Sequence, residues 1–192
     1  MAVEKIFVVG AGTMGNGIAQ TAAVSGFQVT MMDVDQDQLD KAKGTISKSV
    51  EKLFQKERIS AEGKENALQI KMTNDLEGIE KADLLIEAAT ENFDLKRKIF
   101  IELDENASPK AILASNTSSI SLTQLASATS RPDKVIGMHF MNPVPLMKLV
   151  EIIRGLDTSD ETTKAVIKAA EQMGKVAVEA NDSPGFISNR IL

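Results

Sequence analysis

Short apolar segments alternate with longer amphipathic segments along the first 140 residues of the chain. The apolar segments end in turn residues, as strands buried on both faces of a parallel sheet do; they span 5–10, 27–33, 82–89, 110–115 and 134–140, with a weaker one at 70–75. Segments with helical spacing lie between them, at about 13–25, 35–57, 60–69 and 92–107. Strands that alternate with helices predict right-handed βαβ units. The pattern therefore predicts an α/β fold with a doubly wound, mostly parallel sheet.

The alternation changes after residue 140. The sequence NPVP at 142–145 predicts a rigid turn, and after it come a strand-like segment at 147–155, a helix at 160–174 and a last strand at 175–180. Ser183 before Pro184 is typical of a helix start. We therefore expect added C-terminal strands on the sheet. We also expect residues 35–69 to form a long helix, a turn and a short helix, which would protrude after the second strand as a helical hairpin.

Composition narrows the classes of function. The 192 residues are 43% hydrophobic and 26% charged, with a net charge of -5, and this acidic balance argues against a nucleic-acid partner. No apolar stretch approaches the ~20 residues that cross a membrane, and the N-terminus lacks a signal-peptide pattern. We therefore expect a cytoplasmic protein. The chain has no cysteine and one histidine, so we also expect no metal site.

A glycine-rich stretch lies between the first strand and the first helix. Gly10 permits a tight turn, Gly12 lets the backbone approach a pyrophosphate, and Gly15 lets the helix pack closely on the sheet. The next strand ends in Asp33, which can bind the ribose diol and would repel a 2′-phosphate. This context predicts a Rossmann-type NAD site on the stretch GAGTMG, which also contains Thr13 and Met14. A tight turn without a ligand is the alternative.

His139 and Glu151 are the candidates for acid–base chemistry. If the chain reverses about Pro145, these two positions lie opposite each other on neighbouring strands. Glu151 lies inside the apolar run KLVEII, where a carboxylate needs a partner because an unpaired buried charge is costly. A carboxylate against the imidazole holds one ring tautomer and suits the ring to proton transfer near neutral pH. The alternatives are a histidine that only ends a strand and an edge-strand carboxylate that faces water.

Several blocks of the sequence carry a family resemblance. In chain order they are GAGTMGNGIAQ, IEAATEN, ASNTSSIS, GMHFMNPVPLMKLVEII and DSPGFISNRIL. Together they resemble the NAD-binding domain of the L-3-hydroxyacyl-CoA dehydrogenase family over essentially the whole chain. The resemblance implies NAD-dependent interconversion of a short-chain 3-hydroxyacyl-CoA, such as (S)-3-hydroxybutyryl-CoA, with acetoacetyl-CoA. The substrate partner is therefore expected to be an acyl-CoA thioester.

The resemblance also implies roles for particular residues. His139 would be the catalytic base and Glu151 its orienting partner, while Ser118 and Asn189 would bind the reacting oxygen or the thioester carbonyl. Further cofactor contacts would come from Glu91, Lys96, Asn116 and Ser118, and coenzyme A contacts from Ser49, Lys56, Ser118 and Asn142. From its residues alone, the stretch NTSSIS favours a helix cap. Without the resemblance, the lysines around Lys56 predict a solvated helix face.

Domain organisation follows from the same resemblance. Residues 1–183 would form the NAD-binding domain, and residues 184–192 would begin an all-helical domain that in the family completes the acyl pocket and forms a homodimer. Two other functions stay open. One is a related β-hydroxyacid dehydrogenase, which uses a catalytic lysine and has no need of a histidine–glutamate pair. The other is a non-catalytic NAD-binding protein with the same fold.

Overall fold

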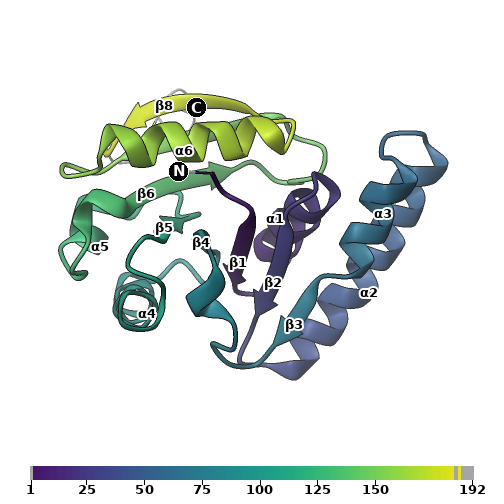
Figure 1. The fold of residues 1–192 in the computed structure, drawn as a ribbon, viewed down its shortest axis with the longest axis horizontal. Coiled ribbons are helices and arrows are strands. Elements are labelled where there is room, and N and C mark those ends of the chain that lie inside the picture. Colours follow the sequence, from purple (N-terminus) through teal and green to yellow (C-terminus); the bar gives the residue numbers. More distant parts are fainter. Residues whose placement is uncertain (1, 184–185, 187–192) are drawn as a thin grey trace.

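The computed structural model describes residues 2–183 and 186, and an eight-stranded sheet forms its centre (Figure 1). The spatial order of the strands is β3-β2-β1-β4-β5-β6-β7-β8. Their bounds are β1 (Lys5–Val9), β2 (Gln28–Met32), β3 (Lys71–Thr73), β4 (Leu84–Glu87), β5 (Ile112–Ser115), β6 (Val135–Phe140), β7 (Leu149–Arg154) and β8 (Val176–Asn181). Neighbouring strands are parallel except for β6 and β7, which are antiparallel. The mostly parallel sheet and its added C-terminal strands are confirmed.

Helices cover both faces of the sheet (Figure 1). They are α1 (Thr13–Val24), α2 (Gln36–Gln55), α3 (Ala61–Leu68), α4 (Phe93–Asn106), α5 (Leu122–Ala126) and α6 (Asp160–Gln172), with two 3₁₀ turns at Ile79–Lys81 and Pro132–Lys134. Within β1, Ile6 and Val8 pack in one core with α1, α2 and α6, while Phe7 and Val9 pack in the other with α4 and α5. Burial on both faces explains why these strands read as continuous apolar runs.

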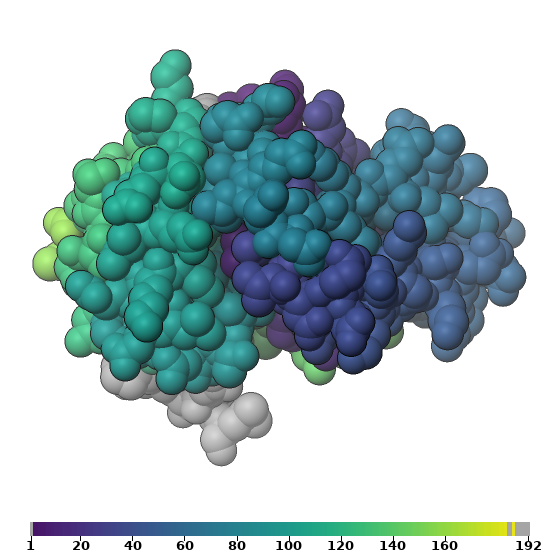
Figure 2. Space-filling model, turned by 90° about the horizontal axis from the view of Figure 1, so that it is seen from below, coloured from purple at the N-terminus to yellow at the C-terminus, as the bar shows by residue number. Residues whose placement is uncertain are grey.

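Helices α2 and α3 form the expected hairpin after β2. The buried residues Leu39, Ala42, Ile46 and Val50 recur at helical spacing and form one stripe along α2. Ser60 caps α3 by accepting a hydrogen bond from the Gly63 amide at 3.0 Å. In the space-filling view the hairpin, coloured blue, extends beyond the rest of the molecule on one side (Figure 2). None of the helices in the described residues is long and apolar enough to cross a membrane.

Helix α5 was not predicted. It has only five residues, too few for helical periodicity to show in the sequence, and it depends on capping. Ser121 accepts a hydrogen bond from the Gln124 amide, so the helix cap expected in NTSSIS is confirmed at this residue. Asp182, which follows β8, accepts hydrogen bonds from the Leu122 and Thr123 amides. The helix expected to begin at Pro184 lies outside the described residues.

Candidate active site

The glycine-rich turn joins β1 to α1 with the geometry that its spacing predicts. Gly10 has a φ of +100°, and a Cβ atom there would lie 2.9 Å from the Ala88 carbonyl oxygen. A Cβ atom on Gly15 would lie 1.8 Å from the Gly10 carbonyl oxygen, so only glycine fits this packing. Gly12 differs, because it is exposed and a Cβ atom there would meet no atom within 4 Å. Among the described residues no side chain caps α1, whose N-terminus can therefore receive an anionic group.

Asp33 lies directly beside this turn, at the end of β2. Its Oδ2 accepts a hydrogen bond from the Ala11 amide at 2.7 Å, and its Oδ1 accepts one from the Asp35 amide at 3.0 Å. The two bonds hold the carboxylate next to the exposed Gly12. A carboxylate in this place suits the ribose diol of NAD and opposes a 2′-phosphate.

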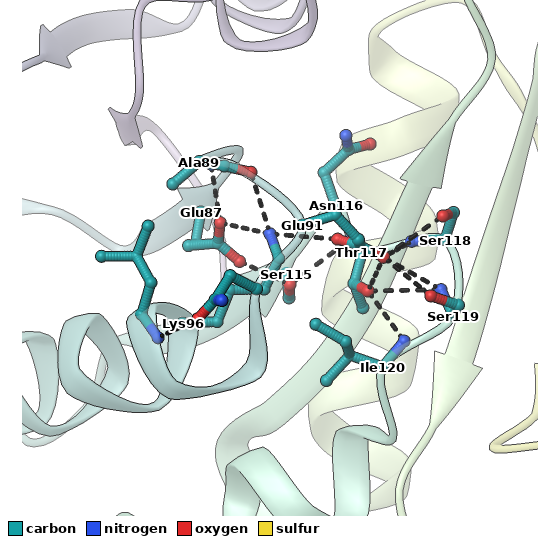
Figure 3. Close-up of polar contacts among 12 residues, drawn as sticks. Glu87, Ala89, Glu91, Lys96, Ser115, Asn116, Thr117, Ser118, Ser119 and Ile120 are labelled. Atoms are coloured by element: carbon teal, nitrogen blue, oxygen red, sulfur yellow. Dashed lines mark hydrogen bonds and ion pairs between the residues drawn. The ribbon is translucent and has the colours of Figure 1, made fainter.

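A buried ionic network links β4, α4 and the end of β5 (Figure 3). Lys96 is only 1% exposed, and its Nζ lies 2.6 Å from Glu87 Oε1 and 3.5 Å from Glu91 Oε2. Glu87 is fully buried and also accepts hydrogen bonds from the Ala89 amide and the Ser115 hydroxyl. Lys96, predicted to lie near the cofactor, is therefore the centre of a buried network. Sequence reasoning missed Glu87, although a carboxylate inside an apolar run was the signal that identified Glu151.

Glu91 organises the turn that follows β5 (Figure 3). Its Oε1 accepts hydrogen bonds from the Thr117 hydroxyl at 2.6 Å and from the Ser118 amide at 2.9 Å, and the hydroxyls of Ser118 and Ser119 also donate to it. Burial raises the pKa of Glu91, but these hydrogen bonds and the charge of Lys96 outweigh it and hold the pKa below its usual range. The predicted catalytic Ser118 is therefore held beside an ionised carboxylate.

Asn116 connects this turn to the strand that carries the histidine. Its side-chain oxygen accepts a hydrogen bond from the Phe140 backbone amide at 2.9 Å, and its backbone amide donates a hydrogen bond to the backbone carbonyl of Glu87. The ends of β4, β5 and β6 are thereby joined at one edge of the sheet. The cofactor positions predicted on Glu91, Asn116 and Ser118 are consequently neighbours in space.

His139 and Glu151 face each other across the antiparallel pair β6 and β7, as the reversal about Pro145 predicted. His139 Nδ1 lies 2.7 Å from Glu151 Oε2, and the residues are 9% and 1% exposed. Phe186 packs near the imidazole, with ring centroids 5.9 Å apart. Because the carboxylate engages Nδ1, Nε2 is the ring nitrogen that can exchange a proton with a reactant.

The predicted coenzyme A residues Ser49, Lys56 and Asn142 line one pocket of about 500 Å³. It lies between α1, α2 and the segment 142–146, and Thr13 also lines it. Two further cations, Lys52 and Arg58, line the pocket beside Lys56. Without the family resemblance, the lysines around Lys56 predicted a solvated helix face. Two of them, Lys52 and Lys56, line this pocket.

One residue of the pocket is itself unsatisfied. Gln20 is 1% exposed, and its Nε2 has no hydrogen-bond partner in the described part of the chain. Gln20 lines the same pocket. An unsatisfied buried donor is costly, so this nitrogen suits an acceptor supplied by a ligand.

Comparison with known proteins decides the family. The model of the 3-hydroxyacyl-CoA dehydrogenase NAD-binding domain matches residues 5–183. The chain belongs to this family. It is 51% identical over 188 residues to the probable 3-hydroxybutyryl-CoA dehydrogenase of Deinococcus radiodurans, covering 98% of the chain and 68% of that protein. The probable 3-hydroxybutyryl-CoA dehydrogenase of Bacillus subtilis is 50% identical over 193 residues, covering 100% of the chain and 67% of that protein.

A solved structure agrees with the sequence relatives. The crystal structure of (S)-3-hydroxybutyryl-CoA dehydrogenase from Ralstonia eutropha superposes with a TM-score of 0.95 at 48% identity, covering 99% of this chain and 68% of that one. This chain of the 3-hydroxyacyl-CoA dehydrogenase family thus spans about two thirds of the length of the relatives it matches.

Two predicted site residues of this 3-hydroxyacyl-CoA dehydrogenase chain remain, Asn189 and Ser118. Asn189 lies outside the described residues, so its predicted contact with the reacting oxygen stays a prediction. Ser118 does not line the pocket that contains Ser49, Lys56 and Asn142, although it was predicted to bind the same substrate. Within residues 2–183 and 186, no group of three or more acidic or histidine side chains could hold a metal ion.

Proposed function

We propose that this chain is the NAD-binding part of an enzyme that interconverts (S)-3-hydroxybutyryl-CoA and acetoacetyl-CoA. The observation that carries the proposal is the buried pair His139–Glu151 beside the dinucleotide-binding edge of the sheet. The family assignment and relatives about 50% identical to the chain support the reaction class. A non-catalytic NAD-binding protein would have no need of such a pair.

Gly12, the uncapped start of α1 and Asp33 form a cradle that fits NAD. NAD accepts a hydride at its nicotinamide ring when it is bound there. In the oxidative direction His139 Nε2 would take the proton of the 3-hydroxyl group, and NAD held in the cradle would supply the hydride acceptor for C3. Glu151 holds the ring tautomer that makes this transfer possible and stabilises the imidazolium that results.

The pocket lined by Ser49, Lys56 and Asn142 would take the coenzyme A portion of the substrate. Lys52, Lys56 and Arg58 supply positive charge for phosphate groups. Gln20 offers its unsatisfied Nε2 to an oxygen of the pantetheine arm. Ser118 would act nearer the reacting carbons, together with Asn189.

The homodimer and the cytoplasmic location belong to the same proposal. Both rest on the resemblance to the family and on the sequence, and the dimer would form through a helical domain that begins at residues 184–192. The wider family includes longer proteins, because this chain covers only 27% of a fatty acid oxidation complex α subunit from Psychrobacter.

Replacement of His139 tests the proposal directly. The full-length protein should oxidise NADH in the presence of acetoacetyl-CoA, and the H139A variant should lose roughly 10²–10⁴ in kcat, the usual contribution of general acid–base catalysis. NADH affinity, measured by fluorescence titration, should hardly change, because His139 is not part of the glycine-rich cradle.

Two glutamate variants serve as a matched pair. E151Q should lower kcat in the same direction as H139A, whereas E179Q, on the exposed edge strand β8, should leave it unchanged. An H139A enzyme with near-parental kcat would refute the assignment of the base. A parent protein that binds NADH without turnover would favour the non-catalytic alternative.

A further inference from the structure

A buried lysine, Lys175, donates hydrogen bonds to the segment that lines one side of the pocket. Lys175 follows Gly174, whose φ of +71° turns the chain away from α6, and it comes directly before β8. Lys175 is 8% exposed. Its ammonium donates one hydrogen bond to the Val144 carbonyl and another, at 2.8 Å, to the Met147 carbonyl. The side chain thus spans from the α6–β8 turn to both ends of the segment 144–147.

The surroundings of this ammonium are unusual for a buried charge. In the described residues no carboxylate lies within ion-pair distance of Lys175 Nζ, and its polar contacts are the two carbonyl groups. Burial lowers the pKa of Lys175. Removing the ammonium would leave these two carbonyl groups without this donor, and a buried acceptor that loses its partner is costly. Lys175 therefore contributes to stability and at the same time fixes the position of these two carbonyl groups.

The same segment is pressed against α1 from the other side. A Cβ atom on Gly17 would lie 2.8 Å from Val144 Cβ and 3.4 Å from Pro145 Cδ, so the loop rests directly on the backbone of α1. Pro143, Val144 and Pro145 line the pocket. The segment 144–147 thus lies between α1 and the ammonium of Lys175.

We propose that Lys175 is a positioning residue for the substrate, because its two hydrogen bonds set where the 142–147 segment closes the pocket. This role rests on the proposed function, in which that pocket takes the coenzyme A arm. Lys175 does not line the pocket of about 500 Å³ itself, so it acts only through the loop. The proposal predicts that losing the ammonium weakens substrate binding much more than it weakens NADH binding.

The K175M variant of the full-length protein tests this role, with K148M as its control. Lys148 is an exposed lysine next to the same loop, so K148M removes an equal charge without a clamp. We expect K175M to raise KM for acetoacetyl-CoA about tenfold, since small displacements of a positioning wall are costly. The values of kcat and of Kd for NADH should stay within about twofold of the parent, while resistance to urea should fall because two carbonyl groups lose their donor. K148M should match the parent in all four measurements.

Hydrogen exchange supplies a readout that does not depend on turnover. The Leu146 and Met147 amides both donate to the Pro143 carbonyl at 3.0 Å, and these bonds close the loop. In K175M these two amides should exchange at least about tenfold faster than in the parent, as expected for a locally freed segment. In K148M they should exchange at the parental rate.

The outcomes separate this role from the proposed function. If the parent does not turn over acetoacetyl-CoA, the proposed function fails, and exchange alone then decides whether Lys175 holds the loop. If the parent is active, an unchanged KM in K175M overturns the positioning role. A loss of NADH affinity in K175M as large as its loss of affinity for acetoacetyl-CoA would also overturn it, because it would show a general structural role.

Discussion

Individual carboxylates in this chain owe their roles to the groups that donate to them. Asp33 accepts hydrogen bonds from two backbone amides beside the glycine-rich turn, and Glu151 contacts the imidazole of His139. Glu91 accepts hydrogen bonds from hydroxyl and amide groups of the turn after β5. For Glu91 these hydrogen bonds outweigh the effect of burial and keep the pKa below its usual range. The three carboxylates thus meet different kinds of donor, which is why we propose different roles for them.

Asp33 should decide the choice of cofactor. Its charge would repel the 2′-phosphate of a cofactor bound at the glycine-rich turn, so we expect kcat/KM with NADH to exceed that with NADPH by more than tenfold, which is about 1.4 kcal/mol. D33N keeps an acceptor for the Ala11 amide but removes the charge, and it should narrow the ratio. D37N, an exposed change of the same kind in α2, should leave the ratio as it is. Comparable efficiencies of the parent with both cofactors would contradict this role.

At the scale of elements, the glycines in the turn between β1 and α1 differ in how closely other atoms pack against them. Gly10 and Gly15 are required by contacts inside the protein, while Gly12 has open space around its Cα. One short motif thus contains two glycines that the packing requires and one glycine that it does not.

Two alanine variants should distinguish these glycines. G15A places a Cβ atom 1.8 Å from the Gly10 carbonyl oxygen and should lower the free energy of unfolding by roughly 1–3 kcal/mol, the usual cost of overpacking. G12A should unfold in urea like the parent but bind NADH at least about tenfold more weakly, because the added methyl group fills the approach of the pyrophosphate. Equal NADH affinity in G12A and the parent would place the cofactor elsewhere.

Helix α5 shows how a distant residue stabilises a short element. Asp182 caps it through the Ser121 hydroxyl and the Leu122 and Thr123 amides. Burial raises the pKa of Asp182, but the hydrogen bonds from Thr123, Ser121 and Leu122 outweigh it, so the pKa lies below its usual value. The ionised cap therefore contributes stability above about pH 4 that is lost as the pH falls through the lowered pKa.

D182N should reveal this contribution. At pH 7 the variant should unfold with a free energy about 1 kcal/mol below that of the parent, a typical value for a cap. The gap should narrow as the pH falls below about 4, since the parent then loses its own charge. Urea unfolding at several pH values measures both effects, with the exposed D157N as the control. A gap that does not depend on pH would show that the charge of Asp182 does not matter.

At the scale of the whole molecule, one edge of the sheet gathers the groups that the proposed reaction needs. The carboxyl ends of parallel strands meet there, which is where α/β proteins of this kind bind ligands. The glycine-rich turn, Asp33, Glu91 and the turn after β5 come from four different strand ends. His139 joins them from β6, and the antiparallel β7 supplies Glu151.

The isolated chain of 192 residues should bind NADH but turn over slowly. Its cofactor residues all precede residue 120, whereas relatives such as that of Deinococcus radiodurans extend well beyond the matched part. We expect NADH affinity within about threefold of the full-length protein and a kcat at least about 10²-fold lower, since even 1 Å of misplacement costs that much. Fluorescence titration and the acetoacetyl-CoA assay measure the two. Full activity of the isolated chain would show that the described domain contains the whole substrate site.

Much of the fold could be predicted because its signals are local. Apolar runs, helical spacing and turn residues identified the strands and the helices except α5, usually to within two residues. The glycine-rich stretch and Asp33 were recognisable because their spacing along the chain reflects one compact β1–α1–β2 unit. The pair His139 and Glu151 was predictable for the same reason, since a tight reversal places residues at equal distances from Pro145 opposite each other.

The sequence by itself thus determined the order of the elements, the glycine-rich turn with Asp33 beside it, and the histidine–glutamate pair. Tertiary structure alone decided which distant groups meet: Lys96 with the buried Glu87, Asp182 with α5, and Lys175 with the loop at 144–147. These contacts join residues far apart in the chain or on different elements, and no periodic pattern encodes them. Their energies depend on burial, which only the packed molecule establishes, because a charge loses its water when the elements around it come together.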